Sequence, residues 1–294
     1  MKPGDILIVD RGFRDVVAIL EALGWIVLMP ALKGNRKQLT TVESNESRRV
    51  TKMRSPVEAI HGIVGQRNKL LHHQVDNKLL PDIGCMCRIT CFINNKFGQR
   101  LESDKEDADQ ILKEMNDNNF AVNTLAQEVE ENRWGRRNLP FQKVSSSAVE
   151  DFFPEMTEHD LKVFSTGTYQ LKQSVSYLAE VMNENNEINM EYANEAPNIL
   201  RIRVPSRQSK STTYKCFIEY VPNGVGCGGV KRHCCDCANG NRTIGCCAHL
   251  AAIIYYLSRY ARYLAKIVKP AEILSKLFLR DQHMPVINDD SDED

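Results

Sequence analysis

Cysteine and histidine gather in one short segment of this 294-residue chain, and that segment constrains the fold more than any other feature. Residues 233–249 read His-Cys-Cys-Asp-Cys-Ala-Asn-Gly-Asn-Arg-Thr-Ile-Gly-Cys-Cys-Ala-His. They contain Cys-x-Cys, nine intervening residues and then Cys-x-His, a paired spacing that is typical of zinc sites. Three thiolates and one neutral imidazole satisfy tetrahedral zinc. Because four protein ligands leave no open position, we expect a structural site rather than hydrolytic chemistry.

Spacing alone leaves the choice of ligands open, because further Cys and His residues lie beside the two pairs. These alternatives are Cys227, His233, Cys234 and Cys246. A set of buried free thiols is the alternative to a metal site, since Cys is often a small core residue. The turn at 239–241 and Gly245 give the chain the freedom to bring both pairs together. The second pair also precedes a predicted helix, whose amide groups stabilise thiolate charge.

This segment resembles the SWIM-type zinc finger, whose pattern is Cys-x-Cys, a variable gap and Cys-x-His. The resemblance extends to residues 167–172, to the strands that end at Tyr220, and to residues 245–252. Residues 231–234, Lys-Arg-His-Cys, depart from the aromatic pair that is more usual there. The resemblance implies a ββα-type module that binds DNA or a protein partner. It also implies the ligand set Cys235, Cys237, Cys247 and His249.

Periodic patterns surround this cluster on both sides. Thr157 and Asp160 form a predicted capping box that opens a helix, and a second helical pattern covers residues 168–183. Apolar residues alternate with polar ones over 200–204 and 214–220, which predicts half-buried antiparallel strands. After the cluster, apolar residues at helical spacing over 250–257 predict a helix.

The N-terminal pattern is strand, helix and strand. Residues 6–9 are a short apolar run typical of a strand buried on both faces, residues 16–23 fit a helix that Gly24 ends, and residues 25–29 predict a second strand. Residues 40–54 look helical, Pro56 is expected to force a new start, and residues 57–71 look helical again. Residues 83–93 fit either a strand or a helix.

This part of the chain resembles the second half of the DDE endonuclease domain of Harbinger-like transposases. The resemblance is carried by residues 4–13, Gly-Asp-Ile-Leu-Ile-Val-Asp-Arg-Gly-Phe, and by residues 49–58, Arg-Val-Thr-Lys-Met-Arg-Ser-Pro-Val-Glu. Residues 94–97, Asn-Asn-Lys-Phe, resemble the end of that domain. The resemblance implies that Asp10 and Glu58 are inherited positions of a three-carboxylate cluster. In such sites two magnesium ions clamp the attacking and leaving oxygens of a phosphodiester.

The two carboxylates are expected to be inactive here. The chain begins nine residues before Asp10, so we expect the strands that carry the first Asp to be absent and the sheet to expose an edge. Magnesium would bind only if missing sequence completed the site. Each acid also has a structural alternative: residues 55–58 form a capping-box sequence in which Glu58 caps a helix, and Asp10 is a turn residue at a strand end. The basic residues Arg48, Arg49, Lys52 and Arg54 are either a phosphate-facing surface or a solvated helix face.

Charge varies in blocks along the chain, although its 38 basic and 38 acidic residues cancel. Residues 1–100 carry 16 basic and 9 acidic groups, residues 101–160 carry 6 and 15, and residues 161–288 carry 16 and 9. The last six residues add five acidic groups. Such asymmetry indicates separate modules and excludes a uniformly basic nucleic-acid binder.

These patterns predict an α+β chain with four parts: a partial ribonuclease-H-like α/β remnant over 1–100, an acidic helical linker over 101–151, the zinc module over 152–280 and an acidic disordered tail over 281–294. No segment reaches the roughly 20 apolar residues of a membrane span, and the N-terminus does not read as a signal peptide. Ten cysteines then indicate a reducing compartment. By resemblance we expect a nuclear, transposase-derived protein without enzymatic activity. The alternatives are a fragment of a magnesium-dependent endonuclease and a protein-interaction adaptor.

Overall fold

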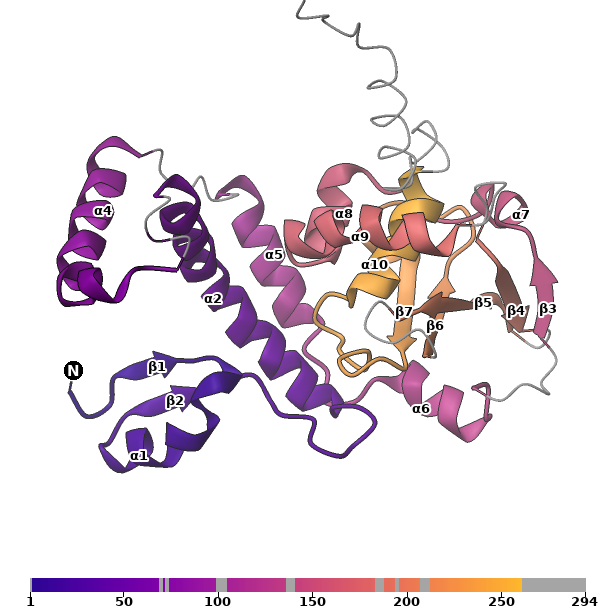
Figure 1. The fold of residues 1–294 in the computed structure, drawn as a ribbon. Helices are drawn as coiled ribbons and strands as arrows, with labels where there is room; N and C mark the ends of the chain where they lie inside the picture. The colour runs from indigo at the N-terminus through magenta and orange to yellow at the C-terminus, as the bar shows by residue number, and fades with distance from the viewer. Residues whose placement is uncertain are drawn as a thin grey trace, which may run out of the picture. The chain divides into compact units, whose positions relative to one another are not determined.

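The computed structural model describes residues 2–68, 71, 74–98, 105–135, 141–182, 188–193, 196–206 and 212–260. The described chain mixes helices with two sheets and is an α+β protein, as predicted (Figure 1). It divides into two compact units. The first runs to Val122 and also takes in Asn241–Ile244, whereas the second contains Asn123–Gly240 and resumes at Gly245.

The first unit begins with a parallel strand pair joined by a helix. Strands β1 (Ile6–Ile8) and β2 (Ile26–Leu28) pair in register, and η1 (Arg11–Val16) and α1 (Val17–Ala22) connect them. Gly24 follows α1 with φ +83°, a left-handed conformation that glycine adopts without strain. The predicted strand–helix–strand order is therefore confirmed.

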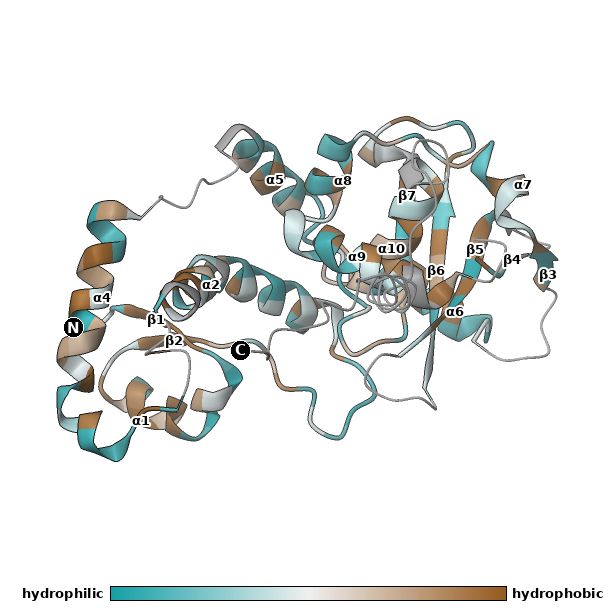
Figure 2. Ribbon diagram, turned by 45° about the horizontal axis from the view of Figure 1, so that its top comes forward, coloured by the Kyte–Doolittle hydropathy of each residue, from teal (hydrophilic) through white to brown (hydrophobic). Residues whose placement is uncertain are grey.

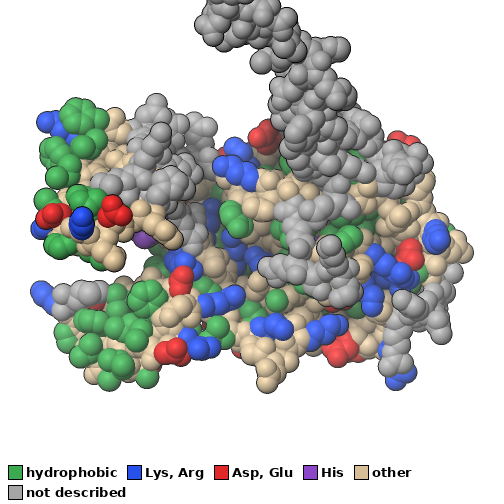
Figure 3. Space-filling view, in the orientation of Figure 1, with side chains coloured by type: hydrophobic (Ala, Val, Ile, Leu, Met, Phe, Trp, Pro, Cys, Tyr) green, Lys and Arg blue, Asp and Glu red, His purple; other side chains and the backbone are tan. Residues whose placement is uncertain are grey.

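The prediction that the first strand is buried on both faces is wrong. Because side chains alternate along a strand, residues 6 and 8 of β1 share a face with residues 26 and 28 of β2. All four are exposed apolar side chains (Ile6, Ile8, Ile26 and Leu28). Figure 2 shows the apolar character of both strands, and Figure 3 shows hydrophobic surface gathered over this part of the unit. The reason is that a two-stranded sheet in the described chain has no layer on this face.

Helix α2 (Thr41–Arg67) is a single helix of 27 residues, so the expected new start at Pro56 is wrong. Its N-terminus is a capping box in which Thr40 accepts a hydrogen bond from the backbone of Glu43 while the Glu43 carboxylate accepts one from Thr40. Beyond it lie η2 (Asn77–Asp82), α4 (Ile83–Phe97) and α5 (Lys105–Asp117). The segment predicted as strand or helix is thus the helix α4, which exposes three cysteines (Cys85, Cys87 and Cys91).

The second unit contains a five-stranded antiparallel sheet in the order β3-β4-β5-β6-β7. Its strands are β3 (Phe141–Val144), β4 (Met190–Ala193), β5 (Ala196–Pro205), β6 (Thr213–Tyr220) and β7 (Val230–Cys235). The segment predicted as an acidic linker contains α5, α6 (Thr124–Glu131), β3 and α7 (Ser146–Glu150). Since β3 is hydrogen-bonded to β4, residues 141–144 of that segment are part of the sheet.

Helices cover one face of this sheet and build the main core. They are α8 (Glu158–Phe164), α9 (Thr168–Val181) and α10 (Ala248–Tyr255), with η3 (Cys227–Gly229) before β7 and the π-helical turn η4 (Tyr256–Tyr260) after α10. The predicted capping box of Thr157 and Asp160 opens α8. Ile202, Val204 and Ile218 from the strands pack with α9 and α10 in this core.

The opposite face of the sheet is covered as well, so β5 and β6 are more than half-buried. Phe217 and Ile199 pack there with Leu125 of α6 and Trp134. Arg201 on the same face is only 3% exposed. Its guanidinium donates to Glu191 at 2.6 Å and to the Trp134 carbonyl at 3.0 Å, and it stacks on the ring of Phe141. A charge buried in this way requires such partners.

Among the described residues, none of the helices combines the length and the apolarity that crossing a bilayer requires. The predicted acidic tail at 281–294 lies outside the described residues.

Candidate metal centre

Four of the clustered residues converge where strand β7 ends and helix α10 begins. Cys235 is the last residue of β7, Cys237 lies in the following turn, Cys247 is the N-cap of α10 and His249 stands in its first turn. All four are buried, and one donor atom from each lies within 4.8 Å of the others. The structure thus brings together the four residues that the resemblance implied, and the cluster can hold a metal ion.

The spacing of the donor atoms suits a tetrahedral ion. The Sγ atoms of Cys235 and Cys247 each lie 3.8 Å from Nδ1 of His249. In tetrahedral zinc, bonds of about 2.3 Å to sulfur and 2.0 Å to nitrogen separate such donors by roughly 3.6 Å. Packing holds the imidazole in this orientation, because its ring lies 4.9 Å from that of Tyr177 on α9 and 4.7 Å from that of Tyr214 on β6.

Two glycines allow the chain to leave the first pair and return with the second. The N–H of Gly240 donates to the Cys237 carbonyl at 2.9 Å, and its carbonyl accepts from the Cys235 N–H at 3.1 Å. A Cβ at residue 240 would overlap the Cys235 carbonyl oxygen. Gly245 has φ +60°, and a Cβ there would lie 2.7 Å from Oγ1 of Thr166. The turn predicted at 239–241 is therefore present, and Gly245 adopts a backbone conformation that favours glycine, as expected from its predicted backbone freedom.

The neighbouring Cys and His residues make other contacts. Because side chains alternate along β7, Cys234 points to the opposite face and packs with Phe217 and Leu125. Cys246 is fully buried, with Sγ 4.0 Å from the Ser165 hydroxyl. The Cys227 thiol donates to the Asp160 carbonyl, and His233 packs against Phe164.

One nearby thiol was not picked out by the sequence patterns. Cys216 on β6 is fully buried and lies directly opposite Cys235 in the β6–β7 pairing. Burial raises the pKa of its thiol to about 12, which keeps it protonated at neutral pH. The period-two pattern of β6 gave the only signal, since it placed Cys216 on the core face of its strand.

The thiols of the cluster differ in their electrostatics. Burial raises the pKa of Cys235 well above its ordinary value, and hydrogen bonding to Cys235 and Cys247 does the same for Cys237. Burial also acts to raise the pKa of Cys247, but hydrogen bonds from Cys235, Cys237 and His249 outweigh it and hold that pKa well below its ordinary value. Of these three thiols, Cys247 is the one whose pKa is lowered. Three buried thiolates together require a compensating cation, which a divalent metal supplies.

The predicted carboxylates lie in the first unit. Asp10 follows β1 and caps η1, because its Oδ1 accepts from the Gly12 N–H at 2.5 Å. Its other oxygen lies 3.5 Å from the guanidinium of Arg54 on α2, and the side chain is half exposed. These are the interactions expected of a turn residue at a strand end. Glu58 lies on α2 one turn after Arg54, and its side chain is outside those described. Since α2 runs through residue 56, the capping-box reading of residues 55–58 is wrong.

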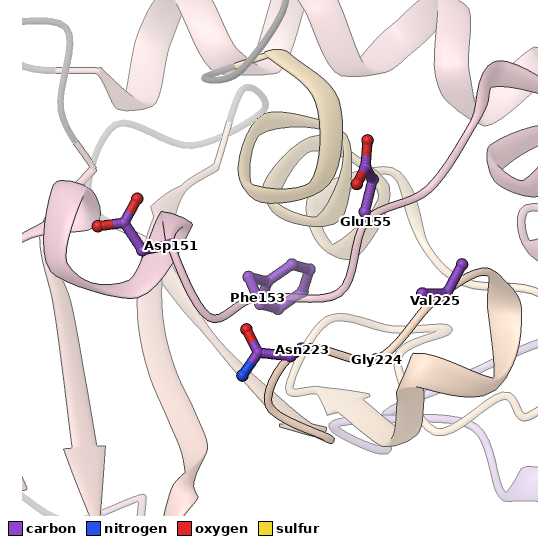
Figure 4. A pocket seen from close by; sticks show the side chains of 6 residues that line it. All are labelled: Asp151, Phe153, Glu155, Asn223, Gly224 and Val225. Carbon is purple, nitrogen blue, oxygen red and sulfur yellow. The ribbon is translucent and has the colours of Figure 1, made fainter.

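A separate cavity of about 410 Å³ in the second unit has two carboxylates among its lining residues. It is lined by Asp151, Phe153, Glu155, Asn223, Gly224 and Val225. Figure 4 shows that the two carboxylates stand on either side of the Phe153 ring and do not converge. Paired acid–base chemistry requires two such groups to face one substrate atom.

Comparison with known proteins bears on the first unit alone. Residues 1–95 match the family model described as DDE superfamily endonuclease. This match covers β1, Asp10, β2, α2 and most of α4. It supports a transposase-related origin for this part of the chain. No curated protein and no solved structure matches the sequence.

Proposed function

We propose that this chain is a transposase-derived zinc-binding protein whose second unit is a SWIM-type zinc finger module. The observation that carries the proposal is the convergence of Cys235, Cys237, Cys247 and His249 on one buried point. Three sulfurs and one imidazole nitrogen are a donor set that selects zinc over magnesium or calcium, which prefer oxygen ligands. The arrangement of a strand hairpin, β6 and β7, followed by the helix α10 agrees with the ββα pattern that the resemblance implies.

The role of the site is structural. When bound, zinc would neutralise the thiolates and tie the end of β7 to the start of α10. The chain itself pre-organises the ligands, since Gly240 closes the turn after the first pair and the rings of Tyr177 and Tyr214 hold the imidazole in its orientation. Because structural zinc contributes folding energy directly, we expect the second unit to lose stability when the metal is removed.

Metal analysis of the purified full chain tests the proposal. We expect about one zinc per chain, as a single four-ligand site implies. Cys247→Ser should lose the metal, because it removes the ligand at the start of α10. Cys234→Ala is the matched control. It removes a thiol that lies next to Cys235 in sequence but on the opposite face of β7, and this variant should keep the metal. Equal zinc content in both variants, or no zinc in the wild type, would contradict the assignment.

For the module's partner we propose DNA or a protein, and a nuclear location. The support is the resemblance and the net positive charge of residues 161–288. Part of that charge is neutralised within the unit. Arg232 pairs with Glu219 and Glu128, and Arg201 pairs with Glu191. A phosphate-binding surface would therefore use other cations, such as the exposed Lys231.

A second candidate is part of a magnesium-dependent DNA endonuclease. It is favoured by the position of Asp10, two residues after the end of β1 inside the matched region. The ion pair with Arg54 counts against a metal ligand in the described arrangement. Under the main proposal the full gene product does not cleave DNA in the presence of magnesium. Cleavage that is lost on Asp10→Asn would establish the endonuclease instead.

A further inference from the structure

The loop between the two ligand pairs is held by the first unit. Residues Asn241–Ile244 belong to that unit, and the ligand pairs belong to the second. The chain thus crosses units at Gly240, three residues after Cys237, and returns at Gly245, two residues before Cys247. Whatever fixes this loop also fixes the span of chain that joins the two halves of the metal centre.

Asn45 on α2 holds the loop through side-chain hydrogen bonds. It is 1% exposed, although asparagine is usually found at the surface. Its Oδ1 accepts from the backbone N–H groups of Thr243 at 2.9 Å and Ile244 at 3.1 Å. Its Nδ2 donates to the Thr243 hydroxyl at 2.9 Å and to the Phe120 carbonyl at 3.1 Å. The side-chain amide therefore uses its two donors and both acceptor positions.

Two further hydrogen bonds also hold the loop in place. The Thr243 hydroxyl donates to the Asn118 carbonyl at 2.6 Å, and Nδ2 of Asn241 donates to the Leu39 carbonyl at 3.2 Å. Ile244 is fully buried. Three of the four loop residues, Asn241, Thr243 and Ile244, are thus held by these hydrogen bonds. A buried network of this kind specifies one conformation, because every broken bond leaves a polar group unpaired.

We infer that Asn45 is a positioning residue for the metal centre, a role that rests on the proposed zinc binding. It touches none of the four ligands and acts through the loop that connects them. When the loop is already fixed, the second ligand pair meets the first without further ordering of the chain. The conformational entropy of the loop is then lost on folding and not on metal binding, so it does not weaken the metal affinity. By linkage, a bound metal stabilises the Asn45 network to the same extent.

The test is the zinc affinity of the full chain, measured by competition with a chromogenic chelator. Asn45→Ala should weaken zinc binding about 10- to 100-fold, the range for residues that orient metal ligands indirectly. Glu46→Ala is the matched control, because Glu46 is the next residue on the same helix and is exposed. The control should bind zinc like the wild type.

Thr243→Val covers the case in which Asn45→Ala does not fold. It removes the hydroxyl from the loop side of the same network and should also weaken zinc binding relative to the control. If both variants fold, the double variant should lose less than the sum of the two single losses, since both act on one network. Zinc affinities equal to that of Glu46→Ala in every folded variant overturn the inference. A wild type that binds no zinc overturns the proposed function instead.

Discussion

A single position along a strand decides which cysteines can meet at the metal centre. Cys234 and Cys235 are neighbours, but strand alternation sends the first toward α6 and the second toward α10. Sequence spacing could predict that a Cys/His cluster exists, yet it left both residues open. The choice depends on the register of β7, which is set by its pairing with β6 rather than by the local pattern.

Gly240 is the residue where substitution should damage the site most without touching a ligand. In Gly240→Ala the new Cβ overlaps the Cys235 carbonyl oxygen, so the turn after the first ligand pair has to move. We expect a loss of at least about 2 kcal/mol in unfolding free energy, in the range of overpacked sites, together with reduced zinc content. Urea unfolding followed by circular dichroism, with metal analysis, measures both.

The control for this prediction is Gly228→Ala in the same unit. Gly228 has open space around a new Cβ and no left-handed backbone conformation. A Gly228→Ala protein that loses as much stability and zinc as Gly240→Ala would contradict the explanation based on the close approach to Cys235.

At the scale of elements, helix α2 shows where sequence rules succeed and fail. Helix α2 begins with a capping box at Thr40, the same type of N-terminal signal that was predicted correctly for α8. Pro56, however, was predicted to interrupt the helix, and it does not. A proline removes one backbone hydrogen bond, and a helix with enough remaining turns can continue through it at a cost of about 3 kcal/mol. Strand β3 was missed for another reason: four residues carry too little pattern, and only pairing with β4 defines them.

The cap of α2 makes part of the protein's stability depend on pH. The Arg36 guanidinium, 2.9 Å from both carboxylate oxygens, and the Thr40 backbone lower the pKa of Glu43 from 4.5 to about 2. A lowered pKa in the folded state means that this stabilisation is complete above pH 4.5 and is lost as the pH falls toward 2. Glu43→Gln should therefore be less stable than the wild type near pH 6, by about 0.5–1 kcal/mol as for other helix caps.

Urea unfolding of both proteins between pH 6 and pH 2 checks this prediction. The two unfolding midpoints should converge as the pH falls below 4.5. A difference that stays constant over this range would show that Glu43 acts by packing and not by its charge.

For the molecule as a whole, the blocks of charge along the sequence indicated separate modules. The α+β class follows from the periodic patterns. The sequence predicted four parts, whereas the contacts of the chain group it into two compact units. The structure of the acidic block could not be read from its charge, because its acidic residues lie partly on helices and residues 141–144 within it form β3. The coverage of the second sheet face by α6 was equally invisible, since it depends on contacts between distant parts of the sequence.

Binding to DNA should show the electrostatics of the entire chain. If the proposed DNA partner is correct, the logarithm of affinity falls linearly with the logarithm of salt concentration, with a slope of about −0.9 for each phosphate contacted. Replacing the five acidic residues of 289–294 by Asn and Gln should strengthen binding at low salt, because the tail no longer competes with phosphate. Titrations in a fluorescence-anisotropy assay measure both, and a flat salt response would favour a protein partner.

The three exposed cysteines on α4 have a practical consequence for handling the protein. Air oxidation reaches Cys85, Cys87 and Cys91 first, since six of the other seven thiols are buried and Cys227 is half-buried. Copies of the chain will therefore cross-link through α4 during storage while the thiols of the metal centre are still reduced. Ladders on a non-reducing gel then report the age of a preparation rather than its state of assembly.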